Sequence, residues 1–496
     1  MFSSGFLFFT GRGKRGVNRK KIRIPGYLPF LVPAFFLLVF VRPYLLRDLW
    51  FDEALTLMNF ALLPSPLAIY RSYVIPNNHI LYTILLHGWI RLPDPGLRQD
   101  FLLRLPSLLL AAASLCVLYG SFRRALGRTP LLIALTALAV SPPFLVYASA
   151  VRGYMAGCFF VSLAAGAACG FARRPGGRIF CGYFLCCLLA VGTVPSDLLA
   201  LCGCVLWALP YTGNRFPPWR RALLLAGAPF AALALFYLPI LPSFLAVCRL
   251  GEGWSDGAGV VRAFAAAAAA AVGIPGVLFL FSCVLRGEKY PWRTGMYAAV
   301  CLLPLPAAFL LSPAPFPRVF LPLFPLLALL SARGIRDGAA FCRLKRGGKG
   351  RVFFAILAVC AVAGGLLLQT GSCRAALSKI CGDAPEDDFF SGYYLRPEHR
   401  PSLTAERLSK MYAPENLPPV FMSFAADPWP TMYYLLERGL RTQFLFDGPR
   451  GRVNSLLPGT LVVLSRGEEP ENTARRFAVR LVPLFDTVKH RVFAVE

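Results

Sequence analysis

Residues 222–246 read ALLLAGAPFAALALFYLPILPSFLA and contain no charged side chain. An α-helix needs roughly 20 consecutive apolar residues to cross the hydrocarbon core of a bilayer, so this stretch predicts a membrane-spanning helix. The same character runs through the chain, because 56% of its 496 residues are hydrophobic and only 16% are charged. A soluble protein of this length would carry more charge on its surface. The sequence therefore predicts an all-α, polytopic membrane bundle.

The apolar stretches predict about 11 transmembrane helices. A shorter apolar stretch, Ile80–Ile90, is too short to span, and we expect it to lie along the outer membrane interface. The predicted spans are 26–46, 104–121, 129–147, 154–172, 179–194, 196–211, 221–246, 259–285, 295–312, 318–335 and 352–370.

The net charge of +27 is concentrated in short segments between the apolar stretches. This is the pattern of cytoplasmic loops in membrane proteins, and no compact basic domain that would bind nucleic acid is present. The predicted localisation is a bacterial inner membrane, with the N-terminus in the cytoplasm. The basic segments are Arg12–Arg23, Arg123–Arg128, Arg173–Arg178, Arg215–Arg221 and Arg333–Arg351.

Three regions follow from this topology. Residues 1–25 form a basic cytoplasmic N-terminus, residues 26–370 form the transmembrane domain with a first outer loop at 47–103, and residues 371–496 form a periplasmic domain. The last region is more polar, and its strand-like stretches 419–424, 443–446 and 461–465 flank a helical stretch at 431–438, which predicts a small α/β domain. Most cysteines lie in apolar stretches, whereas Cys373 and Cys381 fall outside the membrane. A disulfide between these two is one alternative, and two free thiols are the other.

The first outer loop contains the sequence Arg47-Asp48-Leu49-Trp50-Phe51-Asp52-Glu53-Ala54. Neighbouring carboxylates repel, so we expect one of them to have a cation partner or a raised pKa. Such a pair can take a proton from an acceptor hydroxyl or bind a divalent metal, and a solvated loop with an aromatic membrane anchor is the alternative.

Further polar residues gather at the same predicted membrane face. Asn78 and His79 head the interfacial segment, where an amide and an imidazole suit phosphate or metal, although Asn78 is also a good helix cap. Arg104, Arg152 and Arg318 stand at outer ends of predicted spans. A guanidinium there suits a lipid-linked phosphate, with snorkelling to lipid headgroups as the alternative.

These motifs occur in a recognisable order: Trp-Phe-Asp-Glu-Ala at 50–54, Asn-His-Ile-Leu-Tyr at 78–82, Leu-Arg-Leu-Pro-Ser at 103–107, Ser-Pro-Pro-Phe at 141–144 and Arg-Gly-Tyr at 152–154. Together they resemble the bacterial family 39-like branch of the GT-C membrane glycosyltransferases, a superfamily that includes protein O-mannosyltransferases and the aminoarabinose transferase of lipid A. The resemblance covers residues 26 to about 340. Two departures are Ile80-Leu81, where many relatives have prolines, and Ala150-Val151, where relatives have Gln or Glu.

The resemblance implies an inverting transfer of a sugar, hexosyl or pentosyl, from a polyprenyl-phosphate donor to a lipid, glycan or protein acceptor. It places the acidic pair at Asp52 and Glu53, with one acid as base, and the donor-binding residues at Asn78, His79, Arg104, Arg152, Tyr154 and Arg318. A divalent metal held by Asp52, Glu53 and His79 is the one cofactor left open. The rival interpretations are a lipid-linked-sugar flippase or secondary transporter, and an assembly protein without catalysis.

Overall fold

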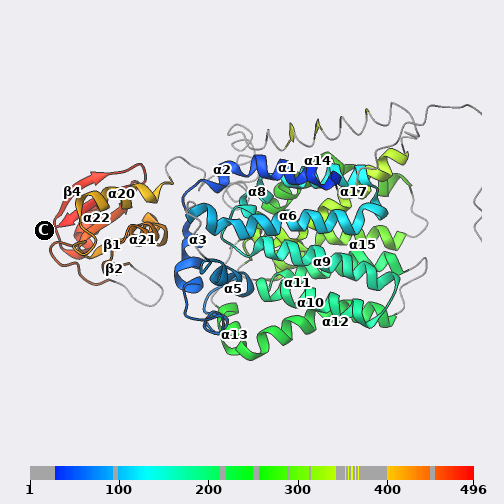
Figure 1. Cartoon of the computed structure of the whole chain (residues 1–496), viewed down its shortest axis with the longest axis horizontal. Helices are drawn as coiled ribbons and strands as arrows, with labels where there is room; N and C mark the ends of the chain where they lie inside the picture. The colour runs from blue at the N-terminus through cyan, green and yellow to red at the C-terminus, as the bar shows by residue number, and fades with distance from the viewer. Residues whose placement is uncertain are drawn as a thin grey trace, which may run out of the picture.

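The computed structural model describes residues 28–76, 78–92, 99–212, 219–249, 256–286, 291–311, 314–341, 399–446 and 453–496, together with parts of 352–367. The basic N-terminus, most of the last predicted span, and Cys373 and Cys381 lie outside the described residues. The described chain forms a helix bundle with a small sheet at one end (Figure 1).

The longer helices of the bundle run side by side along its long axis, and shorter or bent segments complete it (Figure 1). They are α1 (Leu31–Phe40), α6 (Gln99–Leu126), α7 (Arg128–Val140), α8 (Pro142–Ala148), α9 (Tyr154–Arg173), α10 (Gly177–Thr193), α11 (Asp197–Ala208), α12 (Trp219–Tyr237), α13 (Leu241–Arg249), α14 (Gly257–Arg286), α15 (Pro291–Leu302), α16 (Pro304–Leu310) and α17 (Phe324–Phe341). Short elements of the first loop lie between the bundle and the sheet: α2 (Arg42–Leu45), α3 (Phe51–Thr56), a π-helical turn (Leu57–Ala61), α4 (Pro66–Arg71) and α5 (Ile80–Trp89).

Four helices in the described ranges are long and apolar enough to cross a membrane, and the number rises to six if each of two bent pairs counts as one span. The four are Asp100–Leu126, Tyr154–Arg173, Trp219–Arg249 and Pro317–Ala340. The expectation of a polytopic α-helical membrane protein is therefore confirmed, while the count of 11 stays a prediction. Helix α5 has ten residues, which is too few to span.

Prolines bend two of the predicted spans. Helices α7 and α8 meet at 66°, and α15 and α16 meet at 47°. At the first break Ser141 has extended backbone (ψ 135°) before Pro142, because the proline ring disfavours a helical conformation in the preceding residue. Proline also lacks the N–H that would continue the helix, so each pair bends where its proline begins the second segment.

The sheet has five strands in the order β2-β1-β3-β5-β4: β1 (Val420–Met422), β2 (Phe444–Leu445), β3 (Leu461–Ser465), β4 (Leu481–Asp486) and β5 (His490–Val495). Strand β1 pairs in parallel with β2 and β3, whereas β5 is antiparallel to β3 and β4. Helices α20 (Pro401–Met411), α21 (Pro428–Glu437) and α22 (Pro470–Phe477) accompany it. The predicted small α/β domain is thus present, and we call it the sheet unit.

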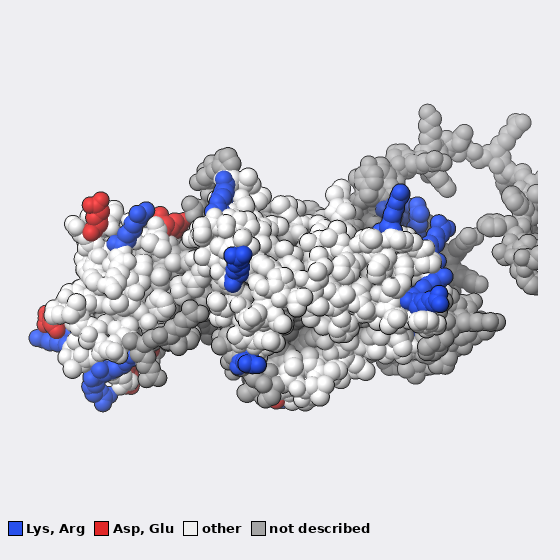
Figure 2. Space-filling model, turned by 90° about the horizontal axis from the view of Figure 1, so that it is seen from below, with Lys and Arg blue, Asp and Glu red and all other residues white. Residues whose placement is uncertain are grey.

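The sheet unit and the first loop share one buried apolar cluster. Leu49 and Leu57 of the loop belong to it together with Val420 and Tyr434 of the sheet unit. Lys and Arg side chains gather at the opposite end of the bundle (Figure 2). The last turn of α6 is also basic, because it contains Arg123 and Arg124. The molecule therefore has one basic end and one end where loop and sheet unit meet.

Candidate active site

The acidic pair lies in the first turn of α3, between the bundle and the sheet unit (Figure 1). A helix N-terminus favours negative charge, so this position suits Asp52 and Glu53. Trp50 precedes the helix with extended backbone (φ −94°, ψ 172°), and its N–H donates to Glu53 Oε2 at 3.1 Å. An acid at the third helical position that accepts this N–H is one half of a capping box, so it fixes where α3 begins.

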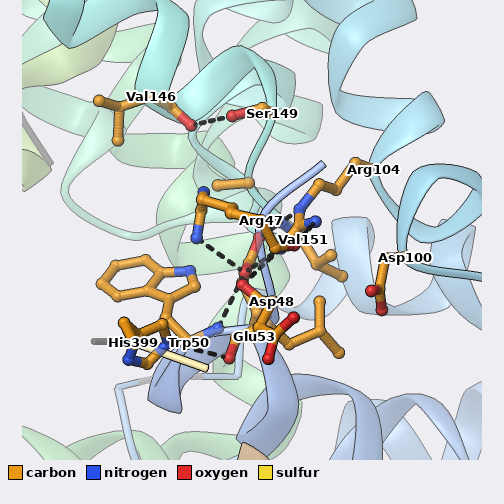
Figure 3. A network of polar contacts seen from close by, with 12 residues as sticks. Arg47, Asp48, Trp50, Glu53, Asp100, Arg104, Val146, Ser149, Val151 and His399 are labelled. Carbon is orange, nitrogen blue, oxygen red and sulfur yellow. Dashed lines mark hydrogen bonds and ion pairs between the residues drawn. The ribbon is translucent and has the colours of Figure 1, made fainter. Parts of the chain in front are cut away.

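Glu53 is fully buried at the centre of a polar network (Figure 3). Arg104 Nη2 donates to Oε2 at 2.9 Å, Arg47 Nη1 donates to Oε2 at 3.3 Å, and the Val151 N–H donates to Oε1 at 2.8 Å. Burial alone would raise the pKa of Glu53, but the charges of Arg104 and Arg47 outweigh it and lower that pKa below its usual value. Glu53 is therefore an ionised anchor inside the protein.

Arg104 is fully buried, and its whole guanidinium group donates hydrogen bonds to acceptors within the protein. Its Nε donates to Glu53 Oε1 at 3.3 Å, and Nη2 donates to Glu53 and to the Asp48 carbonyl at 3.1 Å. Its Nη1 donates to the carbonyls of Leu45 and Arg47 at 3.1 and 2.6 Å. Arginine has five N–H donors, so this geometry leaves none for a donor phosphate. Arg104 ties α6 to the loop that carries the acids.

Asp52 differs from its neighbour in exposure and in partner. Its side chain is 12% exposed, whereas that of Glu53 is 0% exposed. Arg318 Nη2 lies 3.2 Å from Asp52 Oδ2, and the guanidinium also lies over the Phe316 ring at 4.4 Å. Arg318 comes from the 3-10 helix Pro317–Leu323 at the start of the last described span, so residues far apart in sequence meet here. Asp52 is therefore the more exposed acid of the pair.

His79 lies on the other side of the site and is buried against the start of α9. Its Nδ1 accepts the Gly153 N–H at 2.8 Å, and its ring packs edge-on against Tyr154 with centroids 4.8 Å apart. Burial and the charges of Arg152 and Arg318 hold the pKa of His79 well below its usual value. The imidazole is therefore neutral, and Tyr154 packs against it.

Arg152 and His79 present N–H groups to the same region. Because Nδ1 of the neutral ring is an acceptor, the proton resides on Nε2, which lies 3.2 Å from Arg152 Nη2. Both groups are then donors, and neither can accept from the other. Arg152 Nη1 donates to Thr56 Oγ1 at 2.8 Å, which sets the plane of the guanidinium. An anion's oxygen is the kind of acceptor that two converging donors can share.

Asn78 is placed differently from the other predicted site residues. Its Nδ2 donates to the carbonyls of Ile69 and Ser72 at 3.1 and 3.2 Å, so its amide holds the turn before α5. Two of the three predicted metal ligands are already engaged within the protein, because both Glu53 oxygens and His79 Nδ1 accept hydrogen bonds. In the described part of the chain no group of three or more His, Cys, Asp or Glu forms a metal site.

The sequence assigned no role to several residues that build the site. Arg47, Asp48 and Thr56 flank the acidic pair, and proximity to the motif is the signal that points to them. His399 and Tyr434 also contact the loop, but they lie more than 300 residues away. No local pattern in the sequence indicates such long-range contacts.

No known protein family matches the sequence, and no curated protein matches it either. Solved structures do. The structure of ArnT from Cupriavidus metallidurans bound to undecaprenyl phosphate matches with 14% identity and a TM-score of 0.57, over 94% of this chain and 97% of that one. The apo structure of ArnT matches with 15% identity and a TM-score of 0.55 over the same shares. A weaker match is the Archaeoglobus fulgidus oligosaccharyltransferase in complex with Zn and sulfate, with 12% identity, a TM-score of 0.47, and 88% and 68% of the two chains covered. The likeness to ArnT extends over nearly the whole of both chains, so this protein shares the fold of ArnT.

Proposed function

We propose that this protein is a membrane glycosyltransferase that moves a sugar from a polyprenyl-phosphate carrier to a lipid, glycan or protein acceptor. The observation that carries the proposal is the meeting of Asp52 with Arg318, beside the buried donors His79 and Arg152. A carboxylate next to cationic donors is what a transfer from a phosphate requires. The fold supports it, since ArnT was solved with undecaprenyl phosphate bound.

In this proposal Asp52 is the base and the reaction is a single displacement. Asp52 takes the proton from the acceptor hydroxyl or amine, and the acceptor atom attacks the anomeric carbon of the sugar. The bond from that carbon to the phosphate oxygen breaks, and the polyprenyl phosphate leaves with the bonding electrons. Attack opposite the leaving group inverts the anomeric configuration, and Asp52 then returns its proton to solvent. The proposed step uses no metal, because Glu53 and His79 already accept hydrogen bonds within the protein.

The leaving phosphate is assigned to His79, Arg152 and Arg318. The Nε2–H of His79 and the Nη2 group of Arg152 converge, and Arg318 approaches from the Asp52 side. Donors that are already in place where negative charge develops stabilise the transition state without reorganisation. Arg104 and Asn78 are left out of this set, because their N–H groups are used within the protein.

The proposed setting is the outer face of a bacterial inner membrane, with about 11 spans. The shorter apolar helices α10 and α11 lie beside the longer spans, which supports the higher count. The basic end of the bundle supports a cytoplasmic assignment for that end, which leaves the site and residues 371–496 in the periplasm. Reporter fusions after Arg174 should read as cytoplasmic and fusions after Gly392 as periplasmic. A cytoplasmic signal at Gly392 would contradict this orientation.

Asp52→Asn tests the assignment of the base. The substitution keeps shape and hydrogen bonding but removes the basic carboxylate, so turnover with a defined polyprenyl-phosphate sugar should fall about 10²-fold or more. The matched control is Asp256→Asn, which makes the same change in an exposed ion pair with Arg262. Near-normal turnover of Asp52→Asn at unchanged protein level would rule out Asp52 as base.

Arg152→Lys and Arg318→Lys test phosphate binding. A planar guanidinium binds phosphate through two parallel N–H groups, which an ammonium cannot reproduce, so both variants should lose turnover. Arg124→Lys, at the basic end of the bundle, is the control and should behave like wild type. Full activity of both site variants would mean that the two arginines act as anchors only. Lipid extracts of a knockout strain should show which polyprenyl-phosphate sugar accumulates, and thereby identify the donor.

A further inference from the structure

The peptide groups just before the acidic pair are held by the sheet unit. The Leu49 N–H donates to Tyr434 Oη at 2.8 Å, and the Leu49 carbonyl accepts from His399 Nε2 at 3.2 Å. Leu49 is fully buried and belongs to the apolar cluster that the loop and the sheet unit share. Both polar groups of one peptide segment, three residues before Asp52, are therefore paired with a part of the chain that lies beyond the membrane domain.

Two further contacts reinforce this attachment. Asp48 Oδ2 accepts the Ser402 N–H at 2.9 Å in the first turn of α20, where the helix N-terminus favours an anion. Tyr434 Oη in turn donates to the Asp100 carboxylate, with both oxygens at 3.2 Å, so the tyrosine connects the loop to the start of α6. The sheet unit thus contacts Asp48 and Leu49 from three of its residues.

The orientation of His399 is fixed by the residues behind it. Lys489 Nζ lies 3.0 Å from His399 Nδ1 and also pairs with Asp427. An ammonium has only donors, so Nδ1 must accept and the ring proton must reside on Nε2, where it faces the Leu49 carbonyl. Burial lowers the pKa of His399 well below its usual value and the charge of Lys489 acts in the same direction, so the ring stays neutral. Asp427, Lys489 and His399 each orient the next.

We infer that Asp427, Lys489 and His399 are positioning residues for Asp52, which they hold in place through the Leu49 carbonyl. The inference rests on the proposed function, in which Asp52 is the base. It gives the sheet unit a role in the transfer itself, because a shift of about 1 Å in a reacting group can cost about 10²-fold in rate. The exposed fraction of each of the three residues is at most 9%, and none of them needs to touch the substrate to act through the Leu49 carbonyl.

Two substitutions at His399 test whether its hydrogen bond to the Leu49 carbonyl is what matters. The amide nitrogen of His399→Gln can occupy the place of Nε2 and donate to the Leu49 carbonyl, whereas His399→Asn is too short to reach it. The exposed Lys410→Gln in the same unit is the control. Hydrogen exchange of peptides that cover residues 47–53 reports whether the sheet unit still holds this segment, and it does not depend on an activity assay. Exchange there should be at least about tenfold faster in His399→Asn and within about threefold of wild type in His399→Gln and Lys410→Gln.

Kinetics with a polyprenyl-phosphate sugar then report the consequence. His399→Asn should lower kcat about tenfold or more and leave KM for the donor unchanged, because the phosphate-binding arginines are untouched. His399→Gln should recover most of kcat. A loss that came only from unfolding would instead reduce the number of donor-binding sites and leave the kcat of the remaining sites unchanged, which would overturn the inference. Wild-type exchange or wild-type kcat in His399→Asn would overturn it as well.

The exchange of β3 and β5 serves as an internal reference. If these strands also lose protection in His399→Asn, Lys489→Gln decides, since it removes the orienting ammonium and leaves His399 in place. The inference then requires faster exchange at 47–53 with β3 and β5 still protected, and wild-type protection at 47–53 contradicts it. If wild-type protein shows the exchange pattern but turns over no polyprenyl-phosphate sugar, the proposed function fails and the attachment stands.

Discussion

Glu53→Gln is the substitution whose effect the structure defines most closely. Five N–H groups point at the Glu53 carboxylate: Trp50 N and Arg47 Nη1 and Arg104 Nη2 at Oε2, and Arg104 Nε and Val151 N at Oε1. Glutamine replaces one oxygen with an NH₂ group, so at least two of these donors lose their acceptor. The two buried arginines also lose their counter-charge.

The expected cost is large for a change of one atom. Removing one partner of a buried ion pair typically destabilises a protein by about 3–5 kcal/mol, because the remaining charge stays buried without compensation. We therefore expect Glu53→Gln to lower the unfolding temperature of the detergent-solubilised protein by several degrees and to reduce its yield. Asp52→Asn, one residue earlier, breaks an ion pair whose side chains are 12% and 15% exposed, and should lower the unfolding temperature less than Glu53→Gln does.

The assay is a thermal unfolding measurement of wild type, Glu53→Gln and Asp52→Asn in the same detergent, followed by turnover of each. The two acids should separate, with the larger loss of stability at Glu53 and the larger loss of turnover per degree of destabilisation at Asp52. An unchanged unfolding temperature in Glu53→Gln would refute the reasoning that this residue is the buried counter-charge of Arg104 and Arg47. Equal loss of stability in both variants would refute the division of roles between the acids.

Three further predictions follow from the same geometry. Gly153→Ala should lower turnover about 10²-fold, because the added Cβ would lie 2.8 Å from atoms of His79, whereas Gly120→Ala in α6 meets nothing within 4 Å and should be tolerated; turnover of both variants is the measurement. Burial and the charge of Lys489 lower the pKa of His490 to about 3, below the roughly 6.5 of an unfolded histidine, so the unfolded state binds the extra proton and His490 should contribute a fall of about 1.6 kcal/mol in the free energy of unfolding between pH 6.5 and 5. Melts over this range should show a fall that His490→Gln reduces by this amount, while His79 and His399, whose pKa values are also lowered, keep their contributions. Chelator treatment should leave turnover unchanged, and a loss restored by a divalent metal would contradict the assignment of Glu53 as an internal anchor.

The sequence also predicted much of the arrangement along the chain. Helices lie where the apolar stretches placed them, the short helix at Ile80–Trp89 was expected, and β1, β2, β3 and α21 lie within or overlap the predicted stretches of the sheet unit. These features depend on local hydrophobicity and proline position, which a sequence displays directly. The strands β4 and β5 were not predicted; Pro483 interrupts the apolar stretch of β4, and β5 begins with the polar residues His490 and Arg491.

The different roles of the two acids and of the arginines could be read only from the tertiary structure. Asp52 and Glu53 are adjacent in sequence and chemically alike, yet one meets Arg318 at the edge of the site and the other is enclosed by Arg104 and Arg47. Arg104 and Arg152 also looked equivalent at the heads of their spans, until the structure showed one of them donating all five N–H groups to protein acceptors.

The sequence by itself determined that the protein is a membrane bundle, where its helices lie and which polar motifs gather at one face, because each of these depends on residues close together in the chain. Only the tertiary structure decided which acid is fully enclosed, which arginine donates all its N–H groups to the protein, and that His399 contacts the segment before Asp52. These properties depend on burial and on contacts between segments hundreds of residues apart, which no local pattern records.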